Sequence, residues 1–283
     1  MIIEPHKNRA ILYLSEQRLM YLSRMDYSLE QLNGPSILIM SLDGSLELVD
    51  RDKNVSYHSR SFLIPAGTQS VINTNNSILA VCYLDDLGKD LATLKPKMNR
   101  EISFNGKPSI YSGIPDEHNV LKKAYLIFSS EASAKTALNE LNDWIGKPLP
   151  NCNIKSDKRI EMAVGIIKEN AADNVSVDEI AETLGLSVSH LSQLFKEATG
   201  VPIRRYRLWQ RLFIVAAKMA GGMRLTEAAI SAGFSDSAHF SRVFKEICGV
   251  RPTDIWRSKK HSLIHMLAPQ ECKKVDVLEE IET

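Results

Sequence analysis

Apolar residues come in short, strand-like segments over residues 36–84, and from residue 116 onward they recur at helical spacing. Turn-forming clusters such as Asp43-Gly44 and Pro65-Ala66-Gly67 separate the short segments, which is typical of strands joined by tight connections. Closely spaced strands of this kind predict an antiparallel barrel or sandwich. The predicted strands cover residues 36–42, 46–49, 57–64, 70–73 and 78–84.

Two helices are predicted to follow the strands. The first carries apolar residues from Val120 to Tyr125, and the second carries them over residues 131–145. Along the second helix, apolar side chains recur at spacings of four, three and four, so they form one stripe that must be covered. Either the barrel of the same chain or a second copy of the protein can cover it. The stripe consists of Ala134, Leu138, Leu141 and Ile145.

The segment from Gly146 to Asn151 interrupts the helical pattern with one glycine and two prolines, and we place the domain boundary there. A chain of 283 residues is long enough for two domains. We therefore predict a β-rich domain at residues 1–146 with a helical pair at its end, a linker at 147–156 and an all-helical domain at 157–261. Residues 262–283 lack a core-forming pattern and are expected to form a flexible tail.

The composition is that of an ordinary globular protein, with 44% hydrophobic and 24% charged residues. No apolar run approaches the roughly 18–20 residues that a membrane span needs, and the first residues lack the build of a signal peptide. We expect a cytoplasmic protein without a membrane partner. The net charge is only +1, but residues 155–261 carry 17 Lys or Arg against 12 Asp or Glu. A local net charge of +5 favours an anionic partner for this block.

An internal repeat lies within the basic block. The letters AETLGL from Ala181 correspond to AISAGF from Ala229, and LSQLFKE from Leu191 corresponds to FSRVFKE from Phe240. Each copy reads as two helices joined at a glycine, Gly185 or Gly233, which is the build of a helix-turn-helix unit.

Local signals support this interpretation of both copies. Ser176 and Glu179 form a capping-box pattern before the first copy, and Ser187 is placed to cap its second helix. The outward faces of the second helices carry small polar and basic side chains, which fit a major groove about 12 Å wide. A merely solvated face is the alternative, and two matched copies favour DNA. The faces are Val188, Ser189, Ser192, Gln193 and Lys196 in the first copy, and Ser237, Ala238, Ser241, Arg242 and Lys245 in the second.

A single connecting helix is predicted between the copies, because residues 203–220 lack glycine and proline and keep an apolar stripe. Eighteen residues at about 1.5 Å each span roughly 27 Å. This length suits recognition helices in adjacent major grooves, which lie about 34 Å apart. Basic residues near the start of the helix are expected to contact phosphates: Arg204, Arg205, Arg207 and Arg211.

The segment GFSDSAHFSRVFKEICGVRPTDIWR, from Gly233 to Arg257, closely resembles the signature of the AraC/XylS family of bacterial transcription regulators. The resemblance extends back to about Ser156 and includes Arg211-Leu212. It implies that the two recognition helices enter successive major grooves of double-stranded DNA. Gly221-Gly222 after the connecting helix departs from the family pattern and can loosen the coupling of the two units.

The resemblance also implies roles for the N-terminal domain. Many members of the family carry a cupin-like β-barrel that senses a small molecule, and a helical pair that dimerises. We therefore expect the stripe at residues 134–145 to be the seam of a homodimer. The sequence identifies no effector residues, a protein partner can replace the small ligand, and RNA polymerase is the expected partner of an activator. Activation and repression are both compatible with the pattern.

An enzyme is the remaining alternative for the barrel. A metal-dependent cupin needs several histidine and carboxylate ligands on facing strands, and the predicted strands contain only His58. A methyltransferase needs an activated cysteine, whereas Cys82 lies in an apolar strand and Cys152 in the linker. We therefore predict no catalytic residues, no metal and no cofactor.

Overall fold

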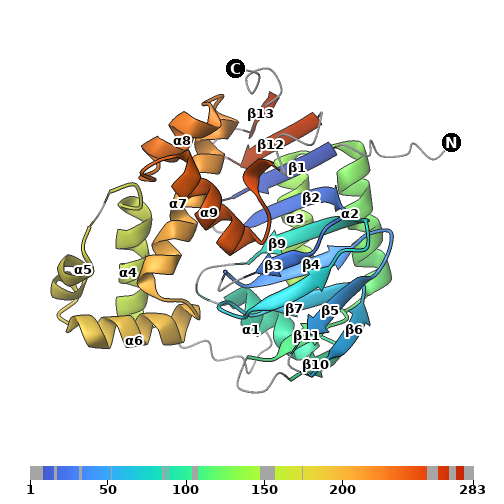
Figure 1. The fold of residues 1–283 in the computed structure, drawn as a ribbon, viewed down its shortest axis with the longest axis horizontal. Coiled ribbons are helices and arrows are strands. Elements are labelled where there is room, and N and C mark those ends of the chain that lie inside the picture. The colour runs from blue at the N-terminus through green and yellow to red at the C-terminus, as the bar shows by residue number, and fades with distance from the viewer. Residues whose placement is uncertain are drawn as a thin grey trace.

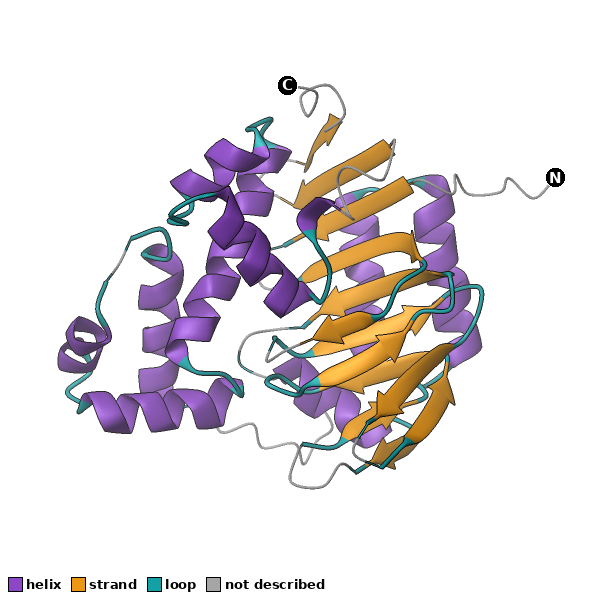
Figure 2. Cartoon of the chain, in the orientation of Figure 1, coloured by secondary structure: helices purple, strands orange, loops and turns teal. Residues whose placement is uncertain are grey.

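The computed structural model describes residues 9–15, 18–31, 34–51, 53–84, 87, 89–103, 108–146, 157–173, 175–253, 261–267 and 272–276. Within these ranges a β-rich N-terminal half packs against a helical C-terminal half (Figures 1 and 2). The predicted α+β fold class, a β-barrel followed by an all-helical unit, is confirmed. The predicted linker at 147–156 lies outside the described residues.

The strands form two sheets. The larger has the order β10-β11-β7-β4-β9-β2-β1-β12-β13, and the smaller has the order β3-β8-β5-β6. All described pairings are antiparallel except that of β1 with β12. The strands are β1 (Arg9–Leu14), β2 (Leu19–Met25), β3 (Leu29–Gln31), β4 (Ile37–Ser41), β5 (Leu46–Asp50), β6 (Val55–Ser59), β7 (Ser61–Ile64), β8 (Ser70–Asn73), β9 (Ser77–Tyr83), β10 (Arg100–Ile102), β11 (Ile110–Ser112), β12 (His261–Leu267) and β13 (Cys272–Asp276).

The larger sheet is buried on both faces, and this explains why part of it escaped prediction. On β4, Ile39 faces the smaller sheet while Leu38 faces the opposite way, and both are fully buried. A strand that is apolar on both faces shows no alternation, so β1 and β2 do not stand out in the sequence. The single strand predicted over residues 57–64 is in fact two, β6 and β7, which belong to different sheets.

Helices cover the second face of the larger sheet and form the whole C-terminal unit (Figure 1). The helix α2 and the helix α3 lie behind the sheet, and α4 to α9 make up the C-terminal unit. The helices are α1 (Lys89–Leu94), the 3-10 turn η1 (Lys95–Lys97), α2 (Glu117–Ser130), α3 (Ala134–Ile145), α4 (Lys158–Glu169), α5 (Val177–Thr183), α6 (Val188–Thr199), α7 (Ile203–Ala220), α8 (Leu225–Ser231) and α9 (Ser237–Cys248).

The apolar stripe of α3 packs on the barrel of its own chain. Ala134 and Leu141 are fully buried, and Leu138 and Ile145 are 5% and 3% exposed, in one cluster with inner residues of the larger sheet. The second face of that sheet needs an apolar cover, and α3 supplies it. These four side chains are not available as a seam between copies, so the expectation that they dimerise the protein is wrong.

The segment predicted as a flexible tail also differs. Residues 261–267 form β12, which runs parallel to β1 with Arg9 opposite His261 and Leu14 opposite Met266. His265 is 4% exposed and its ring stacks on that of Tyr13, with ring centroids 5.0 Å apart. Strand pairing satisfies the backbone groups that β1 otherwise leaves open at the sheet edge. A pairing between residues about 250 positions apart leaves no local signal in the sequence.

The C-terminal unit shares its core with the barrel. One apolar cluster contains Phe62 and Leu79 of the barrel together with Leu212 of α7 and Phe240 of α9. The rings of Tyr83 and Trp209 join the two halves, with centroids 4.9 Å apart. The position of the helical unit is therefore tied to the packing of the barrel.

We expect the substitution Leu138→Glu to lower the free energy of unfolding by roughly 3–5 kcal/mol, because it places an unpaired carboxylate in a core that loses a leucine. Thermal melting with light scattering measures both stability and mass. The matched control is Asn139→Glu, which adds the same charge at an exposed neighbouring position. A Leu138→Glu protein with an unchanged melting temperature and half the mass of the wild type would show instead that the stripe joins two copies.

Candidate nucleic-acid interface

The first helix-turn-helix unit begins at a complete capping box. The backbone N–H of Glu179 donates to Ser176 Oγ at 3.1 Å, and the backbone N–H of Ser176 donates to Glu179 Oε2 at 2.9 Å. Gly185 has a φ of 64°, a left-handed conformation that lets the chain turn between α5 and α6. Ser187 then caps α6 by accepting a hydrogen bond from the His190 backbone N–H at 3.3 Å. The predicted caps of this unit are confirmed.

The outward face of α6, which the sequence predicts to be exposed, is exposed in the structure. Leu191 and Phe195 are fully buried on the opposite side, and Leu194 is half-buried. On the outer side, Gln193 Nε2 donates to Glu197 Oε1 at 2.9 Å, so the two side chains lie together. The exposed residues of this face are Val188, Ser189, Ser192, Gln193 and Lys196.

The second unit repeats this construction with a different cap. Asp236 caps α9 by accepting a hydrogen bond from the His239 backbone N–H at 2.7 Å. That bond, and a second from the Ser235 hydroxyl, hold the pKa of Asp236 below its usual range. Phe234 packs under the turn between α8 and α9. Its ring contacts those of His239 and Phe240 edge-on, with centroids 5.4 Å apart in each pair. The exposed face of α9 consists of Ser237, Ala238, Ser241, Arg242 and Lys245.

The four arginines predicted to contact phosphates lie in different surroundings. Arg204 is exposed, whereas Arg205 is half-buried and donates from Nη1 to Glu246 Oε2 of α9 at 2.9 Å. Arg207 is also half-buried, and burial lowers its pKa. Arg211 is 6% exposed and donates to backbone carbonyls inside the protein. The prediction that Arg211 contacts phosphates is therefore wrong, because its guanidinium is enclosed by the packing of the two units.

A concave groove of about 440 Å³ lies between the start of α7 and α9. Its lining includes Arg204, Arg205 and Arg242, with His239 beside them and Glu246 as the acidic member. Three guanidinium groups outweigh one carboxylate, so the groove suits an anion such as a backbone phosphate. His239 and Glu246 were not among the predicted residues, because only the packing of α7 against α9 brings them to this groove.

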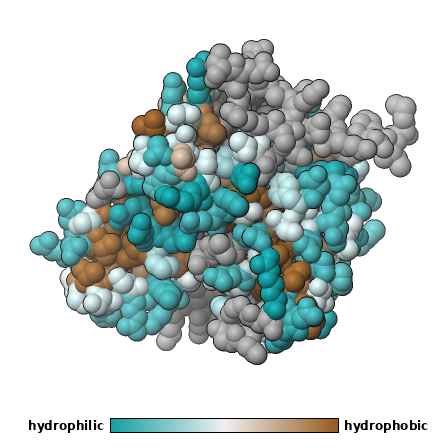
Figure 3. Space-filling view, in the orientation of Figure 1, coloured by the Kyte–Doolittle hydropathy of each residue, from teal (hydrophilic) through white to brown (hydrophobic). Residues whose placement is uncertain are grey.

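On the face of the molecule that Figure 3 shows, most exposed side chains are polar. Figure 3 shows apolar side chains gathered over α4–α6, the helices of the first unit. The large apolar residues exposed on these helices are Met162 at 55% and Val188 at 38%.

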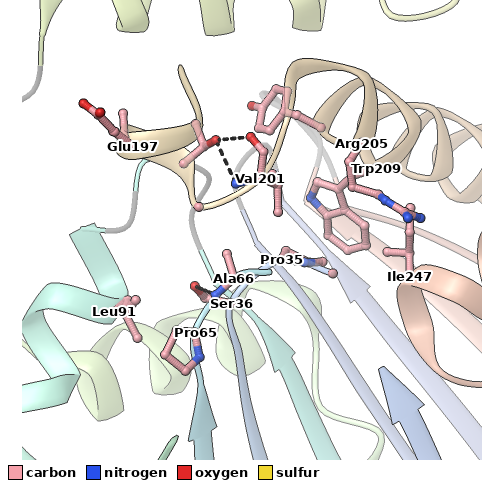
Figure 4. A pocket seen from close by; sticks show the side chains of 15 residues that line it. Pro35, Ser36, Pro65, Ala66, Leu91, Glu197, Val201, Arg205, Trp209 and Ile247 are labelled. Atoms are coloured by element: carbon pink, nitrogen blue, oxygen red, sulfur yellow. Dashed lines mark hydrogen bonds between the residues drawn. The ribbon is translucent and has the colours of Figure 1, made fainter. Parts of the chain in front are cut away.

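A second hollow separates the first unit from the barrel (Figure 4). It has a volume of about 180 Å³ and is enclosed by barrel loops, by α1, and by the turn between α6 and α7. Pro65, Leu91 and Trp209 provide apolar walls, and Arg205 lies at its border. Glu197 also lines it, with a carboxylate that points away from the other labelled side chains in Figure 4. We call it the interdomain crevice. No local pattern in the sequence marks this crevice, since its walls come from segments more than 100 residues apart.

The buried cysteines are not activated. Burial raises the pKa of the Cys82 thiol far above its usual range and raises that of Cys248 to about 12, so both stay protonated. Cys152 lies outside the described residues. Within the ranges that the structure describes, no group of three or more His, Cys, Asp or Glu residues could hold a metal ion, and His58 is exposed on β6. In the same ranges, no helix has the length and apolar character of a membrane span.

Residues 180–258 match the profile of a family described as "Helix-turn-helix domain". The HTH-type transcriptional activator RhaS of Escherichia coli O139:H28 is 33% identical over 104 residues, which cover 35% of this chain and 36% of RhaS. The arabinose operon regulatory protein of Escherichia coli K12 is 33% identical over 101 residues, which cover 35% of this chain and 34% of that protein. The chain thus spans about a third of the length of the curated relatives that it matches.

The fold as a whole is similar to that of a solved regulator. Apo ToxT of Vibrio cholerae superposes with a TM-score of 0.57 over 86% of this chain and 97% of ToxT, at 17% identity. At this identity the likeness concerns the fold alone. ToxT too combines an N-terminal β-domain with a C-terminal helical unit.

The repeated units, their caps and their exposed faces thus coincide with the segment that the sequence comparisons match. Residues 180–258 thus match a helix-turn-helix domain, and this C-terminal part of the chain is similar to the transcription regulators RhaS and the arabinose operon regulatory protein.

Proposed function

We propose that the protein is a sequence-specific transcription regulator that binds double-stranded DNA through α6 and α9 together. The observation that carries the proposal is the exposure of both recognition faces on one rigid connector, α7. Eighteen residues of helix span roughly 27 Å, close to the separation of about 34 Å between adjacent major grooves. Such a regulator acts on bacterial DNA in the cytoplasm, and it contacts RNA polymerase if it is an activator. RhaS is named a transcriptional activator, which supports this class of regulator.

We propose further that an effector acts on the N-terminal half through the interdomain crevice. The space between the barrel and α7 holds a cavity of only about 50 Å³ near Tyr21 and Leu212, which is well below the volume of about 150 Å³ that holds a benzene ring. The crevice, at about 180 Å³, exceeds the apolar cavity of about 150 Å³ that holds a benzene ring. It therefore has room for one ring or a chain of about six carbons.

The lining of the crevice suggests a small carboxylic acid. Apolar walls accept the hydrocarbon part, and the Arg205 guanidinium at the border suits a carboxylate. ToxT of Vibrio cholerae has been solved with an unsaturated fatty acid and with a substituted butenoic acid, which supports this class of ligand. Arg205 also lines the groove between α7 and α9, so a ligand that attracts it competes with Glu246 and changes the charge presented to DNA.

Selection of genomic fragments by the purified full-length protein at physiological salt tests DNA binding. We expect enrichment of fragments that share a motif in two half-sites about one helical turn apart. A fragment pool without enrichment over bulk DNA refutes the central proposal. If the selection yields a motif in one half-site only, just one of the two units reads sequence.

Arg242 is expected to read a guanine through paired hydrogen bonds. Arg242→Ala is expected to weaken binding to the selected operator by roughly 1–3 kcal/mol and to relax selectivity at one base pair. Arg204→Ala is the comparison, because a phosphate contact is lost equally on all sequences and lowers the salt dependence. Titrations of operator and random DNA at several salt concentrations separate the two effects. Equal losses on both DNAs for Arg242→Ala would show that Arg242 contacts only phosphate.

The crevice is tested by calorimetry with hexanoate and with 1-hexanol as its neutral counterpart. We expect hexanoate to bind saturably, hexanol at least about tenfold more weakly, and Leu91→Trp to abolish binding by filling the cavity. The control Leu126→Trp places the same side chain on α2, where Leu126 is 54% exposed. Equal affinities for acid and alcohol, or no binding of hexanoate at millimolar concentration, would contradict a carboxylate site. Control by a protein partner would then become the favoured alternative.

A further inference from the structure

Arg211 lies at the junction of the two helix-turn-helix units. Its Nε donates to the carbonyl of Ala171 at 2.8 Å, and its Nη1 donates to the carbonyl of Gly233 at 2.6 Å. Ala171 belongs to the first unit, between α4 and α5, and Gly233 belongs to the turn between α8 and α9. One side chain of the connecting helix therefore bonds to both units at once.

Both acceptors lie just beyond the C-terminal end of a helix. Ala171 follows Asn170, the C-cap of α4, and Gly233 follows Ala232, the C-cap of α8. The C-terminal ends of helices carry partial negative charge and carbonyls without helical partners. A planar guanidinium can donate to two such carbonyls in fixed directions, which a lysine ammonium cannot do as well.

The two units also touch at this point without an intervening side chain. Gly233 has a φ of 89°, and a Cβ atom built on it lies 2.5 Å from the Ala172 carbonyl oxygen and 2.9 Å from Arg211 Cζ. Only glycine fits between Ala172 and Arg211 at this distance. The backbone of the second unit is thus pressed against that of the first.

The connector packs on both units along its length. Its N-terminal half packs on the first unit, where the rings of Tyr206 and Phe195 meet edge-on at 5.2 Å. It also reaches the second unit, where Arg205 Nη1 donates to Glu246 Oε2 of α9 at 2.9 Å. Its C-terminal half packs on the second unit through Val215 and Met219. Beyond it, Gly222 has a φ of 89° and open space around its Cα. Along the connector, Arg211 lies between Tyr206, which packs on the first unit, and Val215, which packs on the second.

We propose that Arg211 is a positioning residue that fixes α6 and α9 relative to each other, and thereby sets the spacing of half-sites that the protein accepts. The inference rests on the proposed function, since it concerns the DNA that the two units read together. Arg211 itself is enclosed and touches no DNA. Replacing Arg211 therefore affects binding only to DNA sites that both units contact at the same time.

Arg211→Lys tests the proposal on the operator selected by the wild-type protein. Two further sets of duplexes are needed, one with either half-site replaced by unrelated sequence and one with a base pair added or removed between half-sites. We expect affinity for the intact operator to fall about 10- to 100-fold, because the two units lose part of their mutual effective concentration. Affinity for each single half-site is expected to stay within about twofold.

The spacing series is the decisive measurement. The wild type is expected to lose affinity at least about tenfold when one base pair is added or removed, and the variant less than about threefold. Gly233→Ala disturbs the same junction from the second unit and is expected to reproduce the relaxed spacing. The control Arg207→Lys makes the same chemical change one turn earlier on α7, where the buried Nη2 atom of Arg207 has no hydrogen-bond partner within the described residues.

The outcomes separate a positioning role from a structural one. Parallel losses on the intact operator and on both half-sites, with a lower melting temperature, mean that Arg211 only stabilises the fold. An unchanged spacing penalty in a folded Arg211→Lys protein also overturns the proposal. A wild-type protein that selects no DNA refutes the proposed function itself, which is a different result from either of these.

Discussion

The packing of α7 on the open side of the barrel is the contact on which the other features depend. Trp209 lies against Tyr83 and is 4% exposed, and Leu212 and Val215 continue the same face into the shared core. Burial of each such side chain contributes about 1.5–3 kcal/mol, and an aromatic pair adds about 0.5–1.5 kcal/mol. Because a single apolar cluster spans both halves, neither can shift without exposing apolar surface to water.

That shared core gives a direct physical link between the proposed effector site and the proposed DNA-binding faces. The interdomain crevice is bordered by the barrel loops on one side and by the ends of α6 and α9 on the other. Arg205 lines both this crevice and the groove beside Arg242, and it is held there by Glu246. A charged ligand in the crevice therefore interacts with the same Arg205 side chain that lines the groove. No series of intermediate residues is needed to connect the two sites.

Sequence similarity and fold similarity cover different parts of the chain, and the physics of each part explains the contrast. The relatives RhaS and the arabinose regulator match about a third of the chain, where helix caps and glycine turns depend on particular residue types. The likeness to ToxT extends over 86% of the chain at only 17% identity. A barrel core keeps its fold as long as buried side chains retain their apolar character and total volume, so many sequences satisfy it.

The sequence by itself determined the features that depend on neighbouring residues. The capping box of Ser176 and Glu179, the turn at Gly185 and the exposed faces of α6 and α9 follow from spacings of a few residues, and the structure shows all of them. The helices α2 and α3 follow from periodicity in the same way.

Only the tertiary structure decided what covers each surface. The stripe of Leu138 and Leu141 has the same pattern whether it faces a second copy or its own barrel, and Arg211 has the same place on α7 whether it meets phosphate or a buried carbonyl. The pairing of β12 with β1 and the walls of the crevice join segments more than 100 residues apart. Periodicity specifies which side of an element is apolar or charged, but the partner of that side is set by the packing of the whole chain.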